Sequence, residues 1–289
     1  MTQSDGQSFL QRALAFKAYE IEELADVYFF RPLGAVCAYV ARALHLTPVQ
    51  VTLIGTCIGA WGGWLLHDHT RAPAGLALLV FYGVLDSADG QLARMTNRAS
   101  EFGRVFDGIG GYLANAAIFA GIYAGASRGG QTTAYTIVAA AAAVSTIVQA
   151  QMYDYYRRAY TDVAIKGLVP RAAAASIRQP WAESLMRGYE RLQKQLLGGH
   201  LAVIRAVEAR SADGVVRADD RERYRDRFYW LVRGWNVFGD NTRFYVIGAL
   251  LWLGRLDWFF AVMAVPMNLV FLAVWLAQRR ADRGFLRSL

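Results

Sequence analysis

The chain has 289 residues, of which 55% are hydrophobic, and its 31 lysines and arginines outnumber its 23 aspartates and glutamates. The apolar residues stand in blocks that are nearly free of charge, and basic blocks separate them. This arrangement excludes a disordered chain, a coiled coil and a disulfide scaffold, and it is not typical of a soluble domain. The two cysteines, Cys37 and Cys57, indicate neither a disulfide framework nor a zinc cluster. The sequence predicts an all-α integral membrane protein.

The first 48 residues precede any apolar span. They begin with a polar stretch, residues 1–7, and the sequence predicts no cleavable signal peptide. Residues 16–46 then mix apolar and charged side chains at three- and four-residue spacing. Such a pattern favours an amphipathic helix that lies at the membrane interface. We therefore expect residues 1–48 to form a cytosolic or interfacial N-terminal segment.

Six apolar windows follow this segment. A bilayer core about 30 Å thick requires roughly 20 mainly apolar residues in a helix. The candidate spans, in chain order, are Val49 to His67, Ala72 to Leu85, Ile109 to Ala126, Thr133 to Met152, Trp235 to Leu253 and Trp258 to Gln278. The second is short unless its helix runs on past Asp86. We predict a domain of six transmembrane helices over residues 49–289, with a cytosolic insertion at about 157–234.

The basic residues indicate the orientation of these spans. Three brief loops hold one arginine each, and the other 28 of the 31 basic residues lie in the N-terminal segment, the 91–104 linker, the 157–243 region and the C-terminal tail. Lysines and arginines of short loops stay cytosolic. We expect a multi-pass protein of a bacterial-type inner or plasma membrane with both termini in the cytoplasm. Because the charge follows the span boundaries, it indicates contact with membrane lipids and no nucleic-acid partner.

Three carboxylates interrupt the apolar pattern between the second and third spans. Asp86 and Asp89 are three residues apart and would share one helix face near the cytosolic boundary. Gly90 and Ala93 lie on that face one turn further on, where their lack of bulk would let a ligand approach the backbone. A hairpin of neighbouring helices would bring Asp107, at the start of the third span, to the same level. Charges in a membrane span are costly and mark functional sites.

A bound cation is one explanation of such a cluster. Three carboxylates at one membrane depth repel one another strongly unless a cation neutralises them. Hard oxygen ligands suit Mg²⁺ or Mn²⁺, which commonly bind through carboxylates together with substrate phosphates. The alternative is that Asp86 and Asp89 end a helix and pair with Arg94 or Arg98.

The longer spacing carries a resemblance to a known family. The pattern Asp-x2-Asp-Gly-x2-Ala-Arg-x8-Gly-x3-Asp runs from Asp86 to Asp107. It closely resembles the signature of the CDP-alcohol phosphotransferases, integral membrane enzymes that make phospholipid head groups. The segment from Thr47 to Thr52 also resembles the family's Thr-Pro-Asn-x2-Thr element. The clear resemblance covers about residues 47–113.

The resemblance implies a transferase of phospholipid biosynthesis. Such an enzyme moves a phosphatidyl or other phosphoalcohol group from a CDP-linked donor, commonly CDP-diacylglycerol, to a small alcohol or phosphoalcohol acceptor and releases CMP. It implies two Mg²⁺ or Mn²⁺ ions held by Asp86, Asp89 and Asp107, with Asp89 and Asp107 as the catalytic carboxylates. Dimers are usual in the family. The positions that match its CDP contacts are Thr52, Gly90, Ala93, Arg94, Ser100 and Gly103.

The sequence departs from the family pattern at two positions. The fourth signature aspartate, taken to be the base that deprotonates the acceptor, is Gly111 here, and the asparagine of the Thr-Pro element is Val49. General-base catalysis typically contributes about 10² to 10⁴ in rate. One hypothesis is a transferase whose acceptor is deprotonated by a substrate phosphate, a metal-bound hydroxide or another carboxylate such as Asp154. A second is a catalytically silent relative that binds CDP-linked lipid, and a third is a small transporter or structural bundle of spans.

The predicted acceptor site rests on charged residues at the ends of the fourth and fifth spans. Asp154, Arg158, Arg233 and Arg243 would hold a phosphorylated or anionic acceptor if they fold back against the carboxylates, because guanidinium groups match phosphate oxygens. The alternative is that these arginines only anchor span ends on the cytosolic side.

Overall fold

A computed structural model of the chain describes residues 19–98, 100–127, 132–170 and 196–289. Within these ranges the chain is almost entirely helical, and its only β contacts are two isolated bridges, Leu168 with Val215 and Ala212 with Val215. This confirms the predicted all-α class. The chain divides into two compact units: unit 1 contains residues 1–148 and 238–267, and unit 2 contains residues 149–237 and 268–289.

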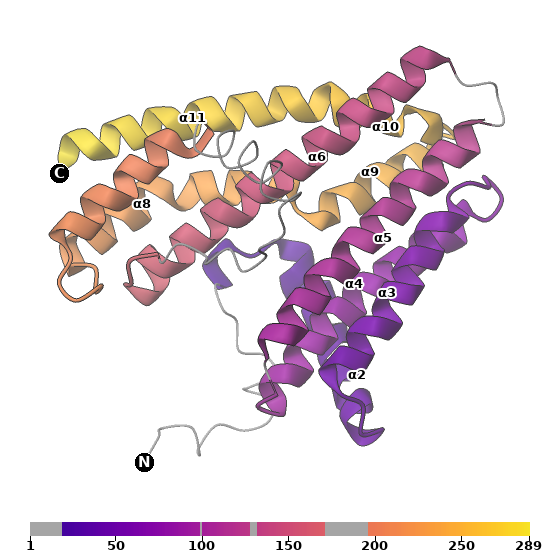
Figure 1. Cartoon of the computed structure of the whole chain (residues 1–289), viewed down its shortest axis with the longest axis horizontal. Helices are drawn as coiled ribbons and strands as arrows, with labels where there is room; N and C mark the ends of the chain where they lie inside the picture. Colours follow the sequence, from indigo (N-terminus) through magenta and orange to yellow (C-terminus); the bar gives the residue numbers. More distant parts are fainter. Residues whose placement is uncertain (1–18, 99, 128–131, 171–195) are drawn as a thin grey trace, which may run out of the picture. The chain divides into compact units, whose positions relative to one another are not determined.

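Unit 1 is built on three consecutive helices, α3 (Pro48–Leu65), α4 (Ala72–Met95) and α5 (Glu101–Ser127), which run side by side (Figure 1). Short turns join them, so α4 runs antiparallel to α3 and α5. A capping box starts α3: the Gln50 backbone N–H donates to the Thr47 hydroxyl over 3.3 Å, and the Thr47 N–H donates to the Gln50 side chain over 2.8 Å. These bonds satisfy donors that the first helical turn would leave unpaired.

Helices α3 and α5 approach each other at glycines. A Cβ atom at Gly63 would lie 2.6 Å from the backbone nitrogen of Ile118, and one at Gly121 would overlap the Gly63 carbonyl oxygen. Between α3 and α4, a Cβ at Gly62 would lie 2.8 Å from the carbonyl oxygen of Gly75. Small residues of this kind let membrane helices pack backbone against backbone. The three helices therefore pack closely at the end where α3 stops and α4 starts.

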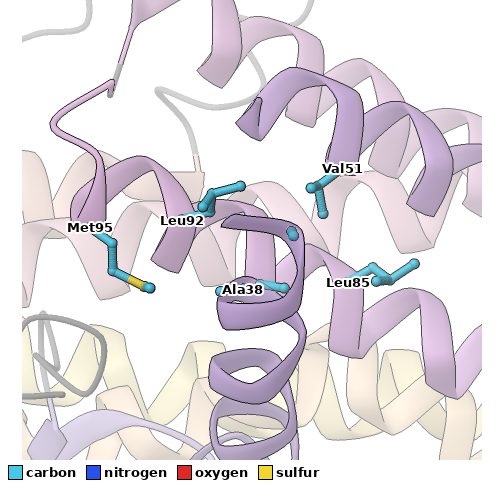
Figure 2. Close-up of a cluster of buried hydrophobic side chains, with 7 residues drawn as sticks. Ala38, Val51, Leu85, Leu92 and Met95 are labelled. Atoms are coloured by element: carbon cyan, nitrogen blue, oxygen red, sulfur yellow. The ribbon is translucent and has the colours of Figure 1, made fainter. Parts of the chain in front are cut away.

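Helix α2 (Arg31–Ala43) packs against the other end of α4, after a π-helical turn at Asp26–Phe30. Gly34 permits this contact, because a Cβ there would lie 2.8 Å from the hydroxyl of Ser87. The interface is a cluster of buried apolar side chains (Figure 2). Its members are Ala38 and Ala41 of α2, Val51 of α3, and Leu85, Ala88, Leu92 and Met95 of α4.

The opposite face of α2 carries large apolar side chains that are exposed, among them Val36, Tyr39 and Val40. A helix with one face in a protein core and another apolar face outside it is consistent with contact to lipid. The described residues therefore form a helix within the predicted N-terminal segment, and its position at the membrane interface stays a prediction.

The remaining elements of unit 1 bring aromatic side chains together. They are the first part of α6 (Thr133–Tyr160), α9 (Asp240–Trp252), a 3₁₀ turn at Leu256–Trp258 and α10 (Phe259–Ala264). Edge-to-face and tilted ring contacts link residues of α5, α6 and α10, namely Phe119, Tyr123, Tyr135, Phe259 and Phe260.

Unit 2 contains the end of α6, a π-helical turn at Thr161–Lys166, a helix over residues 196–210, α8 (Ala218–Trp235) and most of α11 (Pro266–Ser288). A buried polar network lies at its centre. His200 Nδ1 lies 2.9 Å from Oδ1 of Asp282, and His200 Nε2 lies 2.8 Å from the Tyr224 hydroxyl. Burial of polar groups is tolerated because they are bonded to one another.

Four helical segments among the described residues are long and apolar enough to cross a membrane: Ala72–Met95, Val105–Ala126, Thr133–Lys166 and Leu256–Ser288. They correspond to the predicted second, third, fourth and sixth spans and are consistent with a multi-pass membrane protein. The second span does run on past Asp86. Helices α3 and α9, at the predicted first and fifth spans, are not among the four, so the number six stays a prediction. The predicted sixth span is interrupted before Pro266, which lacks the N–H that a continuous helix requires.

Candidate functional site

A narrow pocket lies between α3, α4 and α5, in the half of the bundle where α4 ends. Seven residues line it: Thr52, Gly55 and Thr56 of α3, Tyr82, Asp86 and Asp89 of α4, and Asp107 of α5. The three carboxylates of the signature thus face one pocket. They do so because α4 stays helical to Met95, which puts Tyr82, Asp86 and Asp89 on one face at spacings of four and three residues.

Asp89 is the buried carboxylate of the pocket, with only 6% of its surface exposed. The Thr52 hydroxyl donates to its Oδ2 over 2.5 Å and also lies 3.0 Å from the Pro48 carbonyl oxygen. Arg94 is the basic side chain within electrostatic range of Asp89. A buried carboxylate is costly unless it is hydrogen-bonded or paired, and Thr52 supplies the bond from a different helix.

Asp86 and Asp107 lie within hydrogen-bonding reach of each other across α4 and α5. Asp86 is exposed and Asp107 is half-buried, so both can reach a ligand that enters the pocket. Two ionised carboxylates repel at this separation, and a proton or a cation between them removes the repulsion. An all-oxygen set of donors in such a pocket suits a hard divalent cation.

The described residues nevertheless include no group of three or more His, Cys, Asp or Glu side chains gathered closely enough to form a complete metal site. Asp86 and Asp107 contact each other, whereas Asp89 is bonded to Thr52. The chemistry of the donors fits Mg²⁺ or Mn²⁺, and the metal site itself stays a prediction.

The predicted CDP contacts on α4 follow the carboxylates on the next turns. At Gly90 a Cβ would meet one described atom within 4 Å, Nη1 of Arg94 at 3.5 Å, so the backbone there is open to a ligand. The Nε atom of Arg94 is buried and has no hydrogen-bond partner among the described residues. A buried donor without a partner is costly, and a bound anion would remove that cost. Ala93 is half-buried beside it.

Ser100 and Gly103 have a structural role at the start of α5. The Gly103 backbone N–H donates to the Ser100 hydroxyl over 3.0 Å, which makes Ser100 an N-terminal cap of the helix. Neither residue lines the pocket. Their predicted contact with CDP stays a prediction, and the observed hydrogen bond gives an independent reason for serine at this position.

One predicted acceptor residue, Arg243, lies in the same unit as the pocket. It is 5% exposed, forms an ion pair with Asp240 on α9, and is within electrostatic range of Tyr82. A guanidinium group this deeply buried requires nearby polar or negative groups. Arg243 therefore provides positive charge close to the acidic pocket.

The other predicted acceptor residues, Asp154, Arg158 and Arg233, belong to unit 2. Arg158 Nη2 lies 3.4 Å from Oδ2 of Asp154, and the guanidinium of Arg233 lies over the ring of Tyr229, with 5.8 Å between its carbon and the ring centre. The predicted approach of these three residues to the carboxylates stays a prediction.

Sequence reasoning missed Tyr82 and Thr56, which also line the pocket. Both stand one helical turn from a predicted site residue: Tyr82 is four residues before Asp86, and Thr56 is four residues after Thr52. The four-residue spacing was a usable signal. It was hidden because both residues lie inside apolar windows that are explained by the membrane alone.

The fold and the pocket define a helical membrane protein whose acidic site is formed by three consecutive helices. Residues 45–176 match the family model for CDP-alcohol phosphatidyltransferases. This part of the chain, slightly less than half of it, is therefore similar to the CDP-alcohol phosphatidyltransferase family, and the resemblance predicted from Asp86 to Asp107 is confirmed.

Three curated relatives illustrate the similarity. The phosphatidylinositol phosphate synthase of Streptomyces avermitilis is 26% identical over 156 residues, which cover 53% of this chain and 62% of the relative. The archaetidylinositol phosphate synthase of Pyrococcus horikoshii is 36% identical over 83 residues, 29% of this chain and 44% of the relative. The phosphatidylinositol phosphate synthase of Mycobacterium tuberculosis H37Rv is 31% identical over 86 residues, 29% of this chain and 40% of the relative.

In each of these comparisons the chain spans less than two thirds of the relative's length. No solved structure shows a significant match to the chain.

Proposed function

We propose that the protein transfers a phosphatidyl or other phosphoalcohol group from a CDP-linked donor, CDP-diacylglycerol first among them, to an alcohol acceptor and releases CMP. The observation that carries this proposal is the pocket between three helices that Asp86, Asp89 and Asp107 line. It is supported by the family match, which includes all three residues.

In the proposed reaction, the acceptor hydroxyl oxygen attacks the phosphorus that carries the lipid. A new phosphorus–oxygen bond forms, and the bond from that phosphorus to the bridging oxygen of the diphosphate breaks. CMP leaves with the electron pair of the broken bond, and the acceptor's proton is released to water. A charged diphosphate in such a pocket needs positive charge around it, and the buried Nε of Arg94, which has no partner among the described residues, would donate to one of its oxygens.

Asp86, Asp89 and Asp107 would hold the divalent ions in this proposal. When bound, such ions neutralise the diphosphate and make its phosphorus easier to attack. Thr52 would orient Asp89 through the 2.5 Å hydrogen bond, as partners behind a ligand commonly do. The open backbone at Gly90 would leave room for the nucleotide beside α4.

Inositol phosphate is the acceptor that we propose to test first. Two relatives are named for the formation of phosphatidylinositol phosphate and one for archaetidylinositol phosphate. Transfer of a phosphatidyl group to inositol phosphate would yield the first of these products. The buried charge of Arg243, near Tyr82, supports an acceptor that carries a phosphate.

The test uses the purified full chain in lipid nanodiscs with Mg²⁺, CDP-diacylglycerol and a pool of alcohols that includes inositol phosphate, glycerol phosphate and serine. CMP release and mass spectrometry of the lipids formed are measured together. We expect CMP and one phosphatidyl product, both lost in Asp89→Ala. Release of CMP that survives Asp89→Ala would contradict the proposed site.

A second candidate function is binding of CDP-linked lipid without turnover, which the glycine at position 111 favours because it can neither accept a proton nor bind a metal. This candidate predicts donor binding without CMP release for any acceptor. Calorimetry with CMP, with and without Mg²⁺, separates both candidates from a transporter or structural bundle, for which no Mg²⁺-dependent affinity for CMP is expected.

A further inference from the structure

Tyr82 lines the pocket in a fixed position, and the proposed reaction gives it no role. It lies on α4 one turn before Asp86 and lines the same pocket as the carboxylates. Its ring rests against glycines of α3: a Cβ at Gly59 would lie 2.8 Å from Cγ of Tyr82, and one at Gly55 would lie 3.7 Å from Cδ2. Because the ring packs against the backbone of α3, the position of its hydroxyl is set by the helices.

The hydroxyl of Tyr82 is the remaining neutral hydrogen-bonding group of the pocket lining. The Thr52 hydroxyl donates to Asp89, and the Thr56 hydroxyl donates to the Thr52 carbonyl oxygen over 2.8 Å. Each threonine has a single proton, so both are already used inside the bundle. A ligand hydroxyl in this pocket would find its neutral partner in Tyr82.

Open space lies beside that hydroxyl, at Gly111. A Cβ built there would meet one described atom within 4 Å, the Tyr82 hydroxyl oxygen, at an ordinary contact distance of 3.7 Å. Its neighbour Gly110 differs, because a Cβ at Gly110 would overlap the Thr56 hydroxyl. Helix packing thus accounts for the glycine at 110, whereas the glycine at 111 leaves a gap with room for a Cβ atom beside the Tyr82 hydroxyl.

Charge around the gap completes a site for a polar, anionic molecule. Asp86 and Asp107, the predicted metal ligands, line the same pocket as Tyr82, and the buried guanidinium of Arg243 is within electrostatic range of the Tyr82 hydroxyl. An acceptor that carries both a hydroxyl and a phosphate matches this combination of a neutral hydroxyl partner and a positive charge.

We infer that Tyr82 and the open backbone at Gly111 form the subsite for the attacking hydroxyl of the acceptor. Tyr82 accepts a hydrogen bond from that hydroxyl and keeps its own proton throughout, so the acceptor oxygen retains a lone pair for the phosphorus. The tyrosine positions the acceptor, and the bonds that form and break are those of the proposed reaction, on which this inference rests.

The main test is Tyr82→Phe, which removes one oxygen atom and leaves the ring. We expect the KM for inositol phosphate to rise about tenfold and kcat to change little, because the lost hydrogen bond is made both before and during transfer. Calorimetric affinity for inositol phosphate should fall by the same factor, whereas Mg²⁺-dependent affinity for CMP should not change. Tyr112→Phe, an exposed tyrosine on α5, is the matched control and should alter neither KM nor affinity.

Rescue provides an independent readout. In the Tyr82→Phe background, Gly111→Ser would place a new hydroxyl in the same gap, and we expect it to lower the KM toward the wild-type value. Gly111→Ala in that background adds bulk without a hydroxyl and should not. Gly111→Leu in the wild-type chain should raise the KM with CMP affinity intact, because its side chain fills the gap beside the Tyr82 hydroxyl.

Two results would overturn the inference alone: an active wild-type protein whose KM and affinity for inositol phosphate are unaffected by Tyr82→Phe, or rescue by Gly111→Ala as complete as that by Gly111→Ser. A wild-type chain that releases no CMP with any acceptor would overturn the proposed function and this inference with it. Melting curves in nanodiscs separate loss of fold from loss of binding.

Discussion

Asp89 is the residue on which the proposed chemistry depends most, because it is both buried and bonded to a second helix through Thr52. Asp89→Asn keeps the size of the side chain and removes its charge. We expect CMP release to fall by about 100-fold or more, as is common when one charged contact of a reaction site is lost. Initial rates at saturating Mg²⁺ would measure the fall.

Asp68→Asn is the matched control for this change. Asp68 lies in the turn between α3 and α4, where it accepts hydrogen bonds from Thr70. That turn is at the opposite end of α4 from the pocket, so rates should not change. Equal losses in the two variants would assign the effect to general destabilisation and would contradict a specific role for Asp89.

Gly111 allows a direct test of the departure from the family pattern. Gly111→Asp would put a carboxylate into the gap beside the Tyr82 hydroxyl, where space exists for its Cβ. We expect turnover equal to the wild type or greater, by up to roughly 10² if the new group takes the acceptor's proton. Steady-state rates across pH would show the gain. A collapse of activity in a protein that still melts normally would mean that the gap itself must stay empty.

At the scale of single residues, the fixed spacing on a helix predicted that Asp86 and Asp89 share a face, and they do line one pocket with Asp107 and Thr52, while the roles of these residues stay predictions. It missed Tyr82, since a tyrosine in an apolar window is equally well explained by lipid contact. It also could not separate Gly110 from Gly111: which of two adjacent glycines is required for packing depends on where Thr56 of another helix lies.

The glycines between α3 and α5 determine how closely these elements pack. Gly63→Ala would put a methyl group 2.6 Å from the backbone nitrogen of Ile118, so the helices must separate. We expect a loss of about 1–3 kcal/mol in the free energy of unfolding, as for other overpacked positions. Thermal or SDS unfolding in mixed micelles would measure the loss.

Gly108→Ala, on the partner helix α5, is the control. No described atom lies within 4 Å of a Cβ at that position, and alanine is the better helix former by about 1 kcal/mol. Stability should stay the same or rise. If both alanine variants unfold alike, close packing at Gly63 is not what holds α3 and α5 together.

Element boundaries were less predictable than element existence. Hydropathy ended the second span at Leu85, but α4 continues to Met95 because its polar residues face the pocket while Ala88 and Leu92 pack in the core. Likewise α5 begins at Glu101, eight residues before the apolar window. Hydropathy indicates which residues can face lipid. A membrane helix whose polar face lines a site inside the protein can therefore extend beyond its apolar window.

For the whole molecule, the predicted orientation in the membrane can be tested by labelling introduced cysteines from each side. In a background with Cys37→Ser and Cys57→Ser, a cysteine would be introduced at Asn97, in the turn after α4, or at His69, in the turn before it. The charge pattern predicts position 97 in the cytosol and position 69 outside. A membrane-impermeant maleimide should therefore label position 97 in inside-out vesicles and position 69 in right-side-out vesicles.

Labelling of both positions from one side would show that α4 does not cross the membrane. The reverse pattern would keep the span and contradict the cytoplasmic placement of the termini. Cys57 is replaced because it is exposed and could react with the maleimide. Cys37 is replaced as well, although burial raises the pKa of its thiol and slows its reaction.

The division into two units could not have been predicted, because it falls within helices. The chain leaves unit 1 inside α6, between Val148 and Gln149, and enters unit 2 again inside α11 after Met267. A continuous helix has no change of hydropathy or composition at such a point. The predicted insertion at 157–234 lies within unit 2, and its cytosolic location stays a prediction.

The glycine contacts at Gly63 also have a mechanical consequence. Thr52 stands eleven residues earlier on α3, so the two ends of this stretch are separated by a helical rise of about 16 Å. If the glycine end acts as a pivot, a tilt of roughly 10° displaces the Thr52 end by about 3 Å over that rise. Entry of a lipid-linked nucleotide would then spread one end of the helix pair, and closing would bring Thr52 back to Asp89. When the ligand enters, distances between spin labels on the two helices should widen at the Thr52 end and stay constant at the Gly63 end.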